Sequence, residues 1–437
     1  MADNNPAREF YRALDTELRL LDESSEDSRY VKILQRTPEK DPILALAQNI
    51  LFADSSSVNL LTGFRGNGKS TELRRLKWKL EAQGCVVVLI DMANYMLFTK
   101  PVEISDFTLS LMAGLSVQIQ EKYQLDNVTE SYWERLSHFL DSEVQFEFSA
   151  KLNNVSLGMG LKNDPGFKKS LQKALRGHYG NITQQAREYV TDLVTKLREK
   201  QQDPDLKVVL LVDSVEQIRG IGISDEAQAI HDSVRELFYG QAGSLRFPLL
   251  HVVYTIPPFL PPLMPGIGKA FGAPVVSWPN VHVRKKNGED DKDGLKLLED
   301  IITRRYMNWR QFFNRDQLQR LSRATGGDLR DFFRVLREAL IAASVTEDGV
   351  TDAIVEQVKN RLRREHLPIA IDDARWLAKV HDSKGVELES VDKLAVLERF
   401  FDNNLIMNYL NGEDWYDVHP LLLEEVRRHG VNDAAAG

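Results

Sequence analysis

The sequence contains a single cysteine, Cys85, among 437 residues. One cysteine excludes a disulfide within the chain, and its place in the apolar run CVVVLI favours a buried core residue over a nucleophile. No apolar run approaches the roughly 20 residues that span a membrane. The N-terminal stretch lacks a basic region followed by an apolar core, so it does not resemble a signal peptide. We therefore expect a cytoplasmic protein with no membrane partner.

The chain also lacks an excess of positive charge and any clear metal-ligand pattern. The chain has 56 Lys and Arg against 64 Asp and Glu, a formal net charge of -8. This balance argues against a protein that coats nucleic acid, because phosphate neutralisation supplies most of that affinity. The 9 histidines show no metal-ligand spacing, and we find no nuclease, protease or deaminase constellation. His419, in the stretch DVHP, is interpreted as structural.

A glycine-rich loop is the most specific feature of the sequence. Residues 63–70, GFRGNGKS, fit G-x-x-x-x-G-K-[ST] at every fixed position, between a predicted strand and a predicted helix. Glycines let backbone N–H groups surround phosphate oxygens, and the following helix adds its positive N-terminal end. We expect Lys69 to reach the β- and γ-phosphates and Ser70 to ligate Mg²⁺. The predicted nucleotide-binding residues are Gly63, Phe64, Arg65, Gly66, Asn67, Gly68, Lys69, Ser70 and Thr71. Because a guanine-specific N-K-x-D type motif is lacking, the predicted cofactors are ATP and Mg²⁺.

The pattern around this loop predicts an α/β fold with a parallel sheet. Strand, loop, helix and strand follow one another, and two later apolar runs, KVVLLVD and LLHVVYT, are typical of strands buried on both faces. The predicted strands are 58–62, 85–91, 207–213 and 249–255, with a strand-like segment at 273–283. The predicted helices between them are 70–83 and 225–239.

The chain is predicted to form three domains. Residues 1–293 form the P-loop α/β domain, in which residues 92–206 are an inserted α+β segment with a hairpin at 144–161. Residues 294–366 form a helical lid. Residues 367–437 form a winged-helix-like domain, in which two helices precede a hairpin with Asn411-Gly412 at its tip.

Acidic and polar residues at strand ends complete the candidate site. Asp213 ends the run KVVLLVD and is the predicted metal-binding acid. The following residue is Ser214, where many ATPases have a glutamate, so Glu216 is the nearest candidate base; a solvated carboxylate at a helix start explains Glu216 about as well. Thr255 ends a strand at the same expected sheet edge and is a candidate for contacting the γ-phosphate, although a β-branched strand-end residue is an equal explanation.

Arg330 completes the predicted catalytic set. It falls in the first turn of the helix that begins at GGDLRDF, where negative charge is normally preferred. A γ-phosphate contact accounts for an arginine there, and an ion pair with Asp331 or Glu338 is the alternative. The predicted catalytic residues are Lys69, Asp213, Glu216, Thr255 and Arg330, and the predicted metal ligands are Ser70 and Asp213.

These motifs occur in an order that resembles the AAA+ and STAND classes of P-loop ATPases, especially the origin-initiator-like and KAP-like branches. The resemblance covers residues 30–429, and residues 92–206 match least. It implies that Lys69 and Ser70 are Walker A residues and Asp213 the Walker B aspartate, with Thr255 and Arg330 as the first and second sensors. The VDSVE spacing is closer to the KAP-like pattern. The resemblance also implies a homo-oligomer in which an arginine reaches the neighbouring subunit's nucleotide; the candidates are Arg176, Arg235, Arg246, Arg304 and Arg305.

Three functions remain open on the sequence. The first is an ATP-driven oligomeric switch with a protein partner or effector, which the resemblance associates with bacterial anti-phage defence. The second is a DNA-binding initiator or transposition-type ATPase, supported by the basic stretch KNRLRREH but opposed by the acidic residues of the predicted recognition helix 390–402. The third is a nucleotide-gated binding module with little turnover, consistent with Ser214 after Asp213.

Overall fold

The computed structural model describes residues 5–16, 18–33, 41–142, 162–220, 225–346, 349–388, 390, 393–411 and 413–430. The chain divides into two compact units. One comprises residues 41–62 and 72–276, and the other comprises residues 1–40, 63–71 and 277–437. The P-loop therefore belongs to the unit that holds the C-terminal third of the chain.

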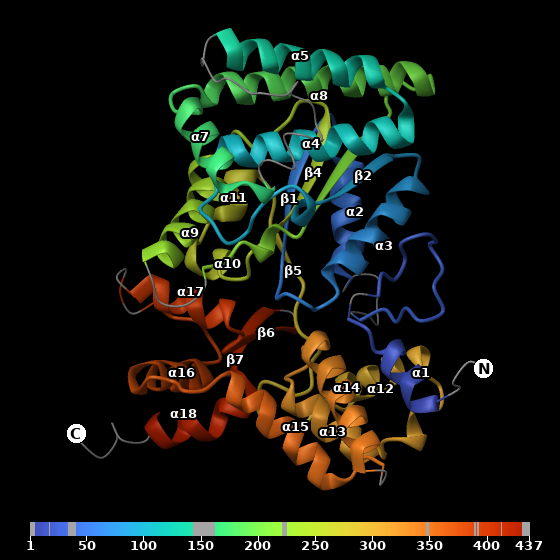
Figure 1. Ribbon diagram of the computed structural model, residues 1–437, viewed down its shortest axis with the longest axis vertical. Coiled ribbons are helices and arrows are strands. Elements are labelled where there is room, and N and C mark those ends of the chain that lie inside the picture. The colour runs from blue at the N-terminus through green and yellow to red at the C-terminus, as the bar shows by residue number, and fades with distance from the viewer. Residues whose placement is uncertain are drawn as a thin grey trace. The chain divides into compact units, whose positions relative to one another are not determined.

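A five-stranded sheet forms the centre of the first unit (Figure 1). Its order is β2-β3-β4-β1-β5, and the pairs β1–β4, β3–β4 and β2–β3 are parallel. All residues of β3 and β4 are buried, which explains their uninterrupted apolar sequences. The predicted parallel α/β fold is confirmed. The strands are β1 (Ser57–Thr62), β2 (Val86–Asp91), β3 (Val208–Asp213), β4 (Leu250–Ile256) and β5 (Val275–Ser277), so β5 is shorter than the predicted segment 273–283.

Helices cover this sheet and fill the predicted insertion. α4 is buried along most of its length and packs against β2, and α5 and α8 pack against α4. Tyr132 of α5 stacks on Tyr189 of α8 with ring centroids 4.5 Å apart. The helical part of the insertion is confirmed, whereas the predicted hairpin 144–161 lies outside the described residues. The helices are α2 (Pro42–Phe52), α4 (Ile104–Tyr123), α5 (Asp126–Ser142), α7 (Pro165–Leu175), α8 (Tyr179–Gln201), α9 (Asp225–Arg235), the π-helix η4 (Glu236–Gly240), α10 (Leu260–Leu263) and α11 (Ile267–Phe271).

The second unit contains a helical bundle with its own core. The N-terminal helix contributes Phe10 to that core, which also includes Trp309, Phe313 and Phe332. The N-terminal helix thus packs with the predicted lid helices, although the sequence places it in the first predicted domain. The predicted domain boundaries themselves stay a prediction. The bundle consists of α1 (Pro6–Ala13), α12 (Lys292–Arg305), α13 (Arg315–Ala324), α14 (Leu329–Thr346) and α15 (Asp352–Glu365).

The same unit ends in what we call the C-terminal module, which consists of α16 (Ile371–Ser383), α17 (Leu394–Asp402), the antiparallel hairpin β6 (Ile406–Asn411) and β7 (Glu413–Val418), and α18 (Leu423–Gly430). Met407, Tyr409 and Trp415 form a small hydrophobic core on the hairpin. The Tyr409 hydroxyl donates to the Gly326 carbonyl at 2.8 Å, which ties the hairpin to the turn between α13 and α14. The predicted order of helices and hairpin is confirmed, and the winged-helix assignment stays a prediction.

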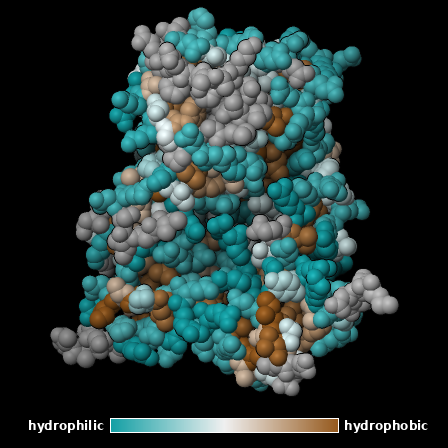
Figure 2. Space-filling view, in the orientation of Figure 1, coloured by the Kyte–Doolittle hydropathy of each residue, from teal (hydrophilic) through white to brown (hydrophobic). Residues whose placement is uncertain are grey.

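The described residues form neither a membrane-spanning helix nor, on the face shown in Figure 2, a continuous apolar surface. None of the helices in the described part of the chain combines the length and apolar character that a membrane crossing requires. The face drawn in Figure 2 is mostly hydrophilic, with separated apolar patches.

Candidate functional site

The P-loop follows β1 and has the backbone geometry that its glycines allow. Gly66 and Gly68 have φ values of 90° and 84°, in the left-handed region that side-chain-bearing residues rarely adopt. α3 (Lys69–Glu81) begins directly after the loop. Successive N–H groups in such a turn, followed by a helix N-terminus, form a concave anion-binding surface. The loop therefore has the backbone shape of a phosphate-binding turn, and phosphate binding itself stays a prediction.

The lysine of the motif is buried within the loop. Lys69 is 3% exposed, and its Nζ donates to the Phe64 carbonyl at 2.6 Å. This bond holds the ammonium group on the loop's own backbone. Ser70 and Thr71 are half-buried in the first turn of α3, and Arg65 is exposed. The positions of these residues agree with the predicted motif, and their roles toward a nucleotide stay predictions.

Two residues outside the motif hold the loop, and sequence reasoning missed both. The Trp278 indole Nε1 donates to the Asn67 carbonyl at 2.8 Å, and Asn67 Nδ2 donates to Asn280 Oδ1 at 2.7 Å. A Cβ on Gly63 would lie 2.3 Å from the Trp278 carbonyl oxygen, so this glycine is required by close backbone approach. No motif marks the stretch VSWPN, because its importance comes only from where folding brings it.

The structure brings the predicted second sensor to the loop. A Cβ on Gly66 would lie 2.6 Å from the Cβ of Arg330 and 3.2 Å from its Nε. Arg330 follows the first residue of α14, and the Asp328 carboxylate caps this helix by accepting from the Asp331 N–H at 2.9 Å. Burial, reinforced by the Asp331 carboxylate, raises the pKa of Asp328 above its usual value. The arginine is thus placed against the P-loop by a capped, buried helix start.

Replacing Gly66 with alanine tests this contact. The left-handed φ alone costs an alanine roughly 1–2 kcal/mol, and overpacking against Arg330 adds about 1–3 kcal/mol. Gly84→Ala is the matched control, because Gly84 has φ +83° and a Cβ there would meet no described atom within 4 Å. We expect Gly66→Ala to lower the Tm in thermal unfolding clearly more than Gly84→Ala, and to weaken ATP binding. Equal losses of Tm would show that Arg330 does not restrict the loop.

The acidic strand end lies in the other unit and has a constrained geometry. Asp213 is 4% exposed, and its Oδ1 accepts from the Ser214 N–H at 2.8 Å. Ser214 has a φ of 70°, so the chain turns sharply after the aspartate. The Thr255 hydroxyl accepts from the Val215 N–H at 3.0 Å and donates to the Val212 carbonyl at 3.2 Å. Thr255 therefore holds the turn that carries Asp213, and its predicted sensor role stays a prediction.

The topology of the sheet places Asp213 and Thr255 near the carboxyl ends of neighbouring parallel strands, on one side of the sheet. β4, which carries Thr255, lies between β3 and β1, the strand that leads into the P-loop. Asp91 ends β2 and pairs in register with Asp213, so a second carboxylate lies at the same edge. The sequence signal for Asp91 was present, since it also ends an apolar strand, but a lone strand-end aspartate is common. The Asp91 Oδ1 accepts from the Ala93 N–H at 3.0 Å. Glu216 lies in the short 3₁₀ turn η3 (Val215–Gln217).

The arginines considered for contact with a neighbouring subunit differ in their surroundings. Arg305 donates to the carbonyls of Ala13 and Asp15 at 3.3 and 3.1 Å, and its guanidinium lies 3.9 Å from the Phe333 ring centroid. Arg235 is paired with Asp232, and Arg246 donates to the Ala270 carbonyl at 3.0 Å. Arg176 and Arg304 are exposed. Arg305 is therefore engaged within its own unit.

Comparisons with known proteins give structural neighbours but no family. No family model matches the sequence, and no curated protein matches it. Similar solved structures include the ORC2 protein of Aeropyrum pernix in its ADPNP–ADP complexes, with a TM-score of 0.41 and 12% identity over 97% of this chain and 98% of that chain. The ADP form of that protein gives a TM-score of 0.39 and 11% identity over 97% and 98%. Cdc6p from Pyrobaculum aerophilum gives 0.37 and 15% identity over 94% and 98%.

TM-scores below 0.5 do not establish a common fold, so the class of this protein is defined by its own architecture. It is an α/β protein in which a five-stranded sheet, parallel in all the pairs described above, carries a strand–P-loop–helix segment. A helical bundle and the C-terminal module follow it in the chain.

Proposed function

We propose that this chain is an ATP-binding and ATP-hydrolysing switch of the AAA+/STAND type that acts as a homo-oligomer. One observation carries the proposal: side chains of the P-loop itself are buried against the C-terminal module. A loop that only binds nucleotide needs its backbone and its lysine. A loop whose remaining side chains hold another module can transmit nucleotide state to that module.

The residues present fit ATP and Mg²⁺. The glycine cradle and the α3 N-terminus are suited to the phosphates, Lys69 to the β- and γ-oxygens, and Ser70 and Asp213 to the metal and its water shell. Bound Mg²⁺ would neutralise phosphate charge that develops during hydrolysis. Arg330 is suited to report the γ-phosphate, since it packs on Gly66. Glu216 is the proposed base for the attacking water.

The contacts with the C-terminal module run from two loop residues. Phe64 is 1% exposed and stacks on Phe401 of α17, with ring centroids 5.9 Å apart and an interplanar angle of 19°. Asn67 bonds to Asn280, whose backbone N–H donates to the Asn408 carbonyl of β6 at 2.9 Å. We name these the loop–module contacts. A change in P-loop geometry on nucleotide binding or hydrolysis would shift α17 and β6 through them.

The DNA-binding alternative receives less support. The basic stretch on α15 is matched by acids: Arg361 pairs with Glu338, and Arg363 pairs with Glu424 and Glu425. On the predicted recognition helix, Arg399 is paired with Asp373 at 2.8 Å, and Glu398 is fully buried. Cations that are already neutralised release fewer counterions on binding DNA. These intramolecular pairs therefore weaken the case for a duplex-reading surface on α15 and α17. A protein partner or effector, and a place in anti-phage defence, remain part of the proposal.

One variant distinguishes the hypothesis of a nucleotide-gated module with little turnover from the hypothesis of an ATP-hydrolysing switch. Glu216→Gln is expected to lower phosphate release while nucleotide binding is retained, because the base is lost and the shape is kept. Unchanged phosphate release would favour the static module.

The proposal is tested by light scattering coupled to size exclusion, with and without ATP–Mg²⁺, while phosphate release is followed. We expect ATP to shift the wild type into a larger assembly. Phe401→Leu is expected to bind ATP within a few-fold of the wild type but to lose much of this shift, because the leucine cannot stack on Phe64.

Phe400→Leu is the matched control, since Phe400 is equally buried on α17 but packs against Trp376 with centroids 5.4 Å apart. It should retain the shift. If the wild type does not change size with ATP, the switch is refuted, and if both variants behave alike, the loop–module contacts do not transmit the signal.

A further inference from the structure

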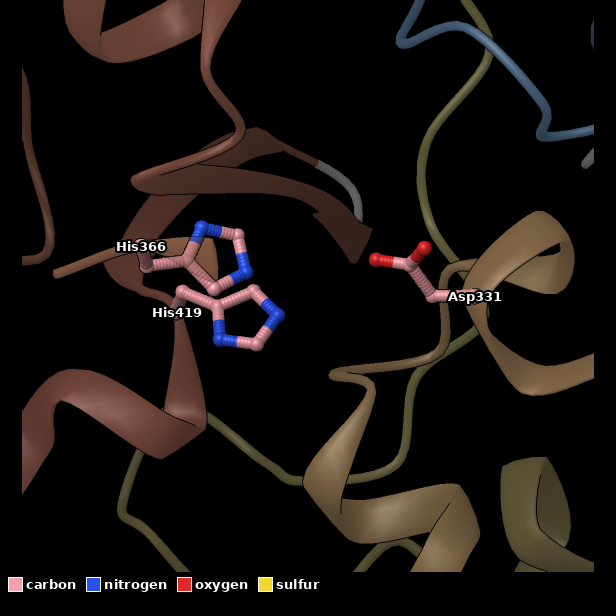
Figure 3. A group of neighbouring side chains, drawn as sticks. All are labelled: Asp331, His366 and His419. Atoms are coloured by element: carbon pink, nitrogen blue, oxygen red, sulfur yellow. The ribbon is translucent and has the colours of Figure 1, made fainter. Parts of the chain in front are cut away.

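A cluster outside the P-loop brings together three groups with metal-ligand chemistry. Asp331 lies on α14, His366 directly follows α15, and His419 precedes η7 (Pro420–Leu422) in the C-terminal module. One ligand atom from each residue lies within 4.8 Å of the others. Figure 3 shows the two imidazole rings lying over each other, with the Asp331 carboxylate pointing toward them. The ring centroids are 4.3 Å apart.

Two nitrogen atoms of this cluster are buried without a partner. Nε2 of His366 and Nε2 of His419 are both inaccessible, and neither has a hydrogen-bond partner among the described residues. His419 is fully buried. Buried polar atoms in native proteins are nearly always satisfied, and an exception calls for a water molecule or an ion. Two such exceptions beside one carboxylate indicate a shared ligand.

We propose that Asp331, His366 and His419 bind a divalent first-row transition-metal ion, for which Zn²⁺ is the reference probe. Two imidazole nitrogens and one carboxylate oxygen form a donor set that suits Zn²⁺, with a water molecule as the fourth ligand. Mg²⁺ and Ca²⁺ prefer oxygen donors, so this ion differs from the Mg²⁺ proposed for the nucleotide. The site shares no ligand with the proposed nucleotide site, so zinc binding can be tested without nucleotide.

The surrounding contacts are those of a supported metal site. Asp331 Oδ1 is held by Arg334 at 3.1 Å, and Arg334 also pairs with Glu365 at 2.7 Å, so its positive charge is balanced.

One contact opposes metal binding. His419 Nδ1 accepts from the Leu421 N–H at 3.3 Å. Coordination through Nε2 requires the ring proton to move to Nδ1, which gives up this acceptor. The contact is long for a hydrogen bond, so a weak interaction is exchanged for a coordinate bond.

An ion at this site would connect three segments of one unit. It would join α14, whose first turn places Arg330 against Gly66, to the end of α15 and to the turn after β7. Metal occupancy would therefore stabilise the arrangement on which the loop–module contacts depend.

The test is Zn²⁺ titration of the chelator-treated, nucleotide-free full chain in competition with a metal-binding dye. We expect one equivalent of Zn²⁺ per chain and a higher Tm in the metal-loaded form. Asp331→Asn, His366→Gln and His419→Gln should each weaken Zn²⁺ binding at least tenfold, because each removes a ligand. Co²⁺ in place of Zn²⁺ should give a visible absorption spectrum that these variants lose.

His429→Gln is the matched control, since it removes an imidazole on α18 outside the cluster and should leave Zn²⁺ binding unchanged. Because His419 is fully buried, its variant could fail to fold, so circular dichroism accompanies each titration and Asp331→Asn, at a half-buried position, gives the decisive result. The proposal is overturned if the folded wild type binds no stoichiometric Zn²⁺, or if folded Asp331→Asn binds it as the wild type does.

Discussion

Replacing Lys69 with alanine is expected to weaken ATP binding by on the order of 10²-fold and to reduce phosphate release to background. Truncating one partner of a buried, charged hydrogen-bonded pair costs about 2–5 kcal/mol, and each 1.4 kcal/mol is about tenfold in affinity. Lys69 is buried, and its Nζ donates a hydrogen bond to the Phe64 carbonyl within the glycine-rich turn. Titration calorimetry with ATP and a phosphate-release assay measure the two effects.

Lys79→Ala is the control for this prediction. Lys79 lies in the last turn of the same helix, so its loss tests the effect of removing one lysine from α3 without touching the loop. It should bind ATP as the wild type does. ATP binding by Lys69→Ala at wild-type affinity would contradict the nucleotide site itself, whatever the outcome for the oligomer or for zinc.

Replacing Asp213 with asparagine is expected to lower the rate of ATP hydrolysis by about 10²–10³-fold, the usual effect of removing one preorganised electrostatic group. ATP affinity should change much less, because the glycine cradle and Lys69 remain. Asparagine keeps the shape and can still accept from the Ser214 N–H, so the turn is preserved. Single-turnover hydrolysis at saturating ATP–Mg²⁺ separates this loss from binding.

Asp91→Asn is the matched comparison for Asp213→Asn. Both aspartates end neighbouring parallel strands in register, and both accept from a nearby backbone N–H. β2, which carries Asp91, is one strand further than β3 from β1, so its carboxylate is less suited to an ion at the P-loop. We expect Asp91→Asn to lose less than tenfold in rate. A larger loss of rate with Asp91→Asn than with Asp213→Asn would identify Asp91, and not Asp213, as the metal-binding aspartate.

Much of the fold could be predicted from local pattern. The strands β1 to β4 were predicted to within one residue at each end, because buried parallel strands are short, largely apolar segments. The length of β5 and the packing of α1 were not predicted. Both depend on neighbours far along the chain, and Phe10 finds its partners in helices that begin after residue 290.

The candidate site, like the fold, could be predicted only in part from the sequence. The P-loop was recognisable because its chemistry is local: two glycines, a lysine and a hydroxyl must stand at fixed offsets to surround phosphate. Arg330 was singled out by its odd position at a helix start, and the structure brings it to Gly66. Asn280 carried no signal, because an asparagine in a loop is common.

The sequence by itself determined the class of fold and the position of the P-loop, since periodicity and short motifs describe what neighbouring residues must do. Only the tertiary structure decided that Phe64 stacks on Phe401 and that His366 and His419 lie beside Asp331. Such contacts join residues far apart in the chain. Nothing in local spacing encodes them, because they arise when separately formed helices and strands bury their apolar faces together.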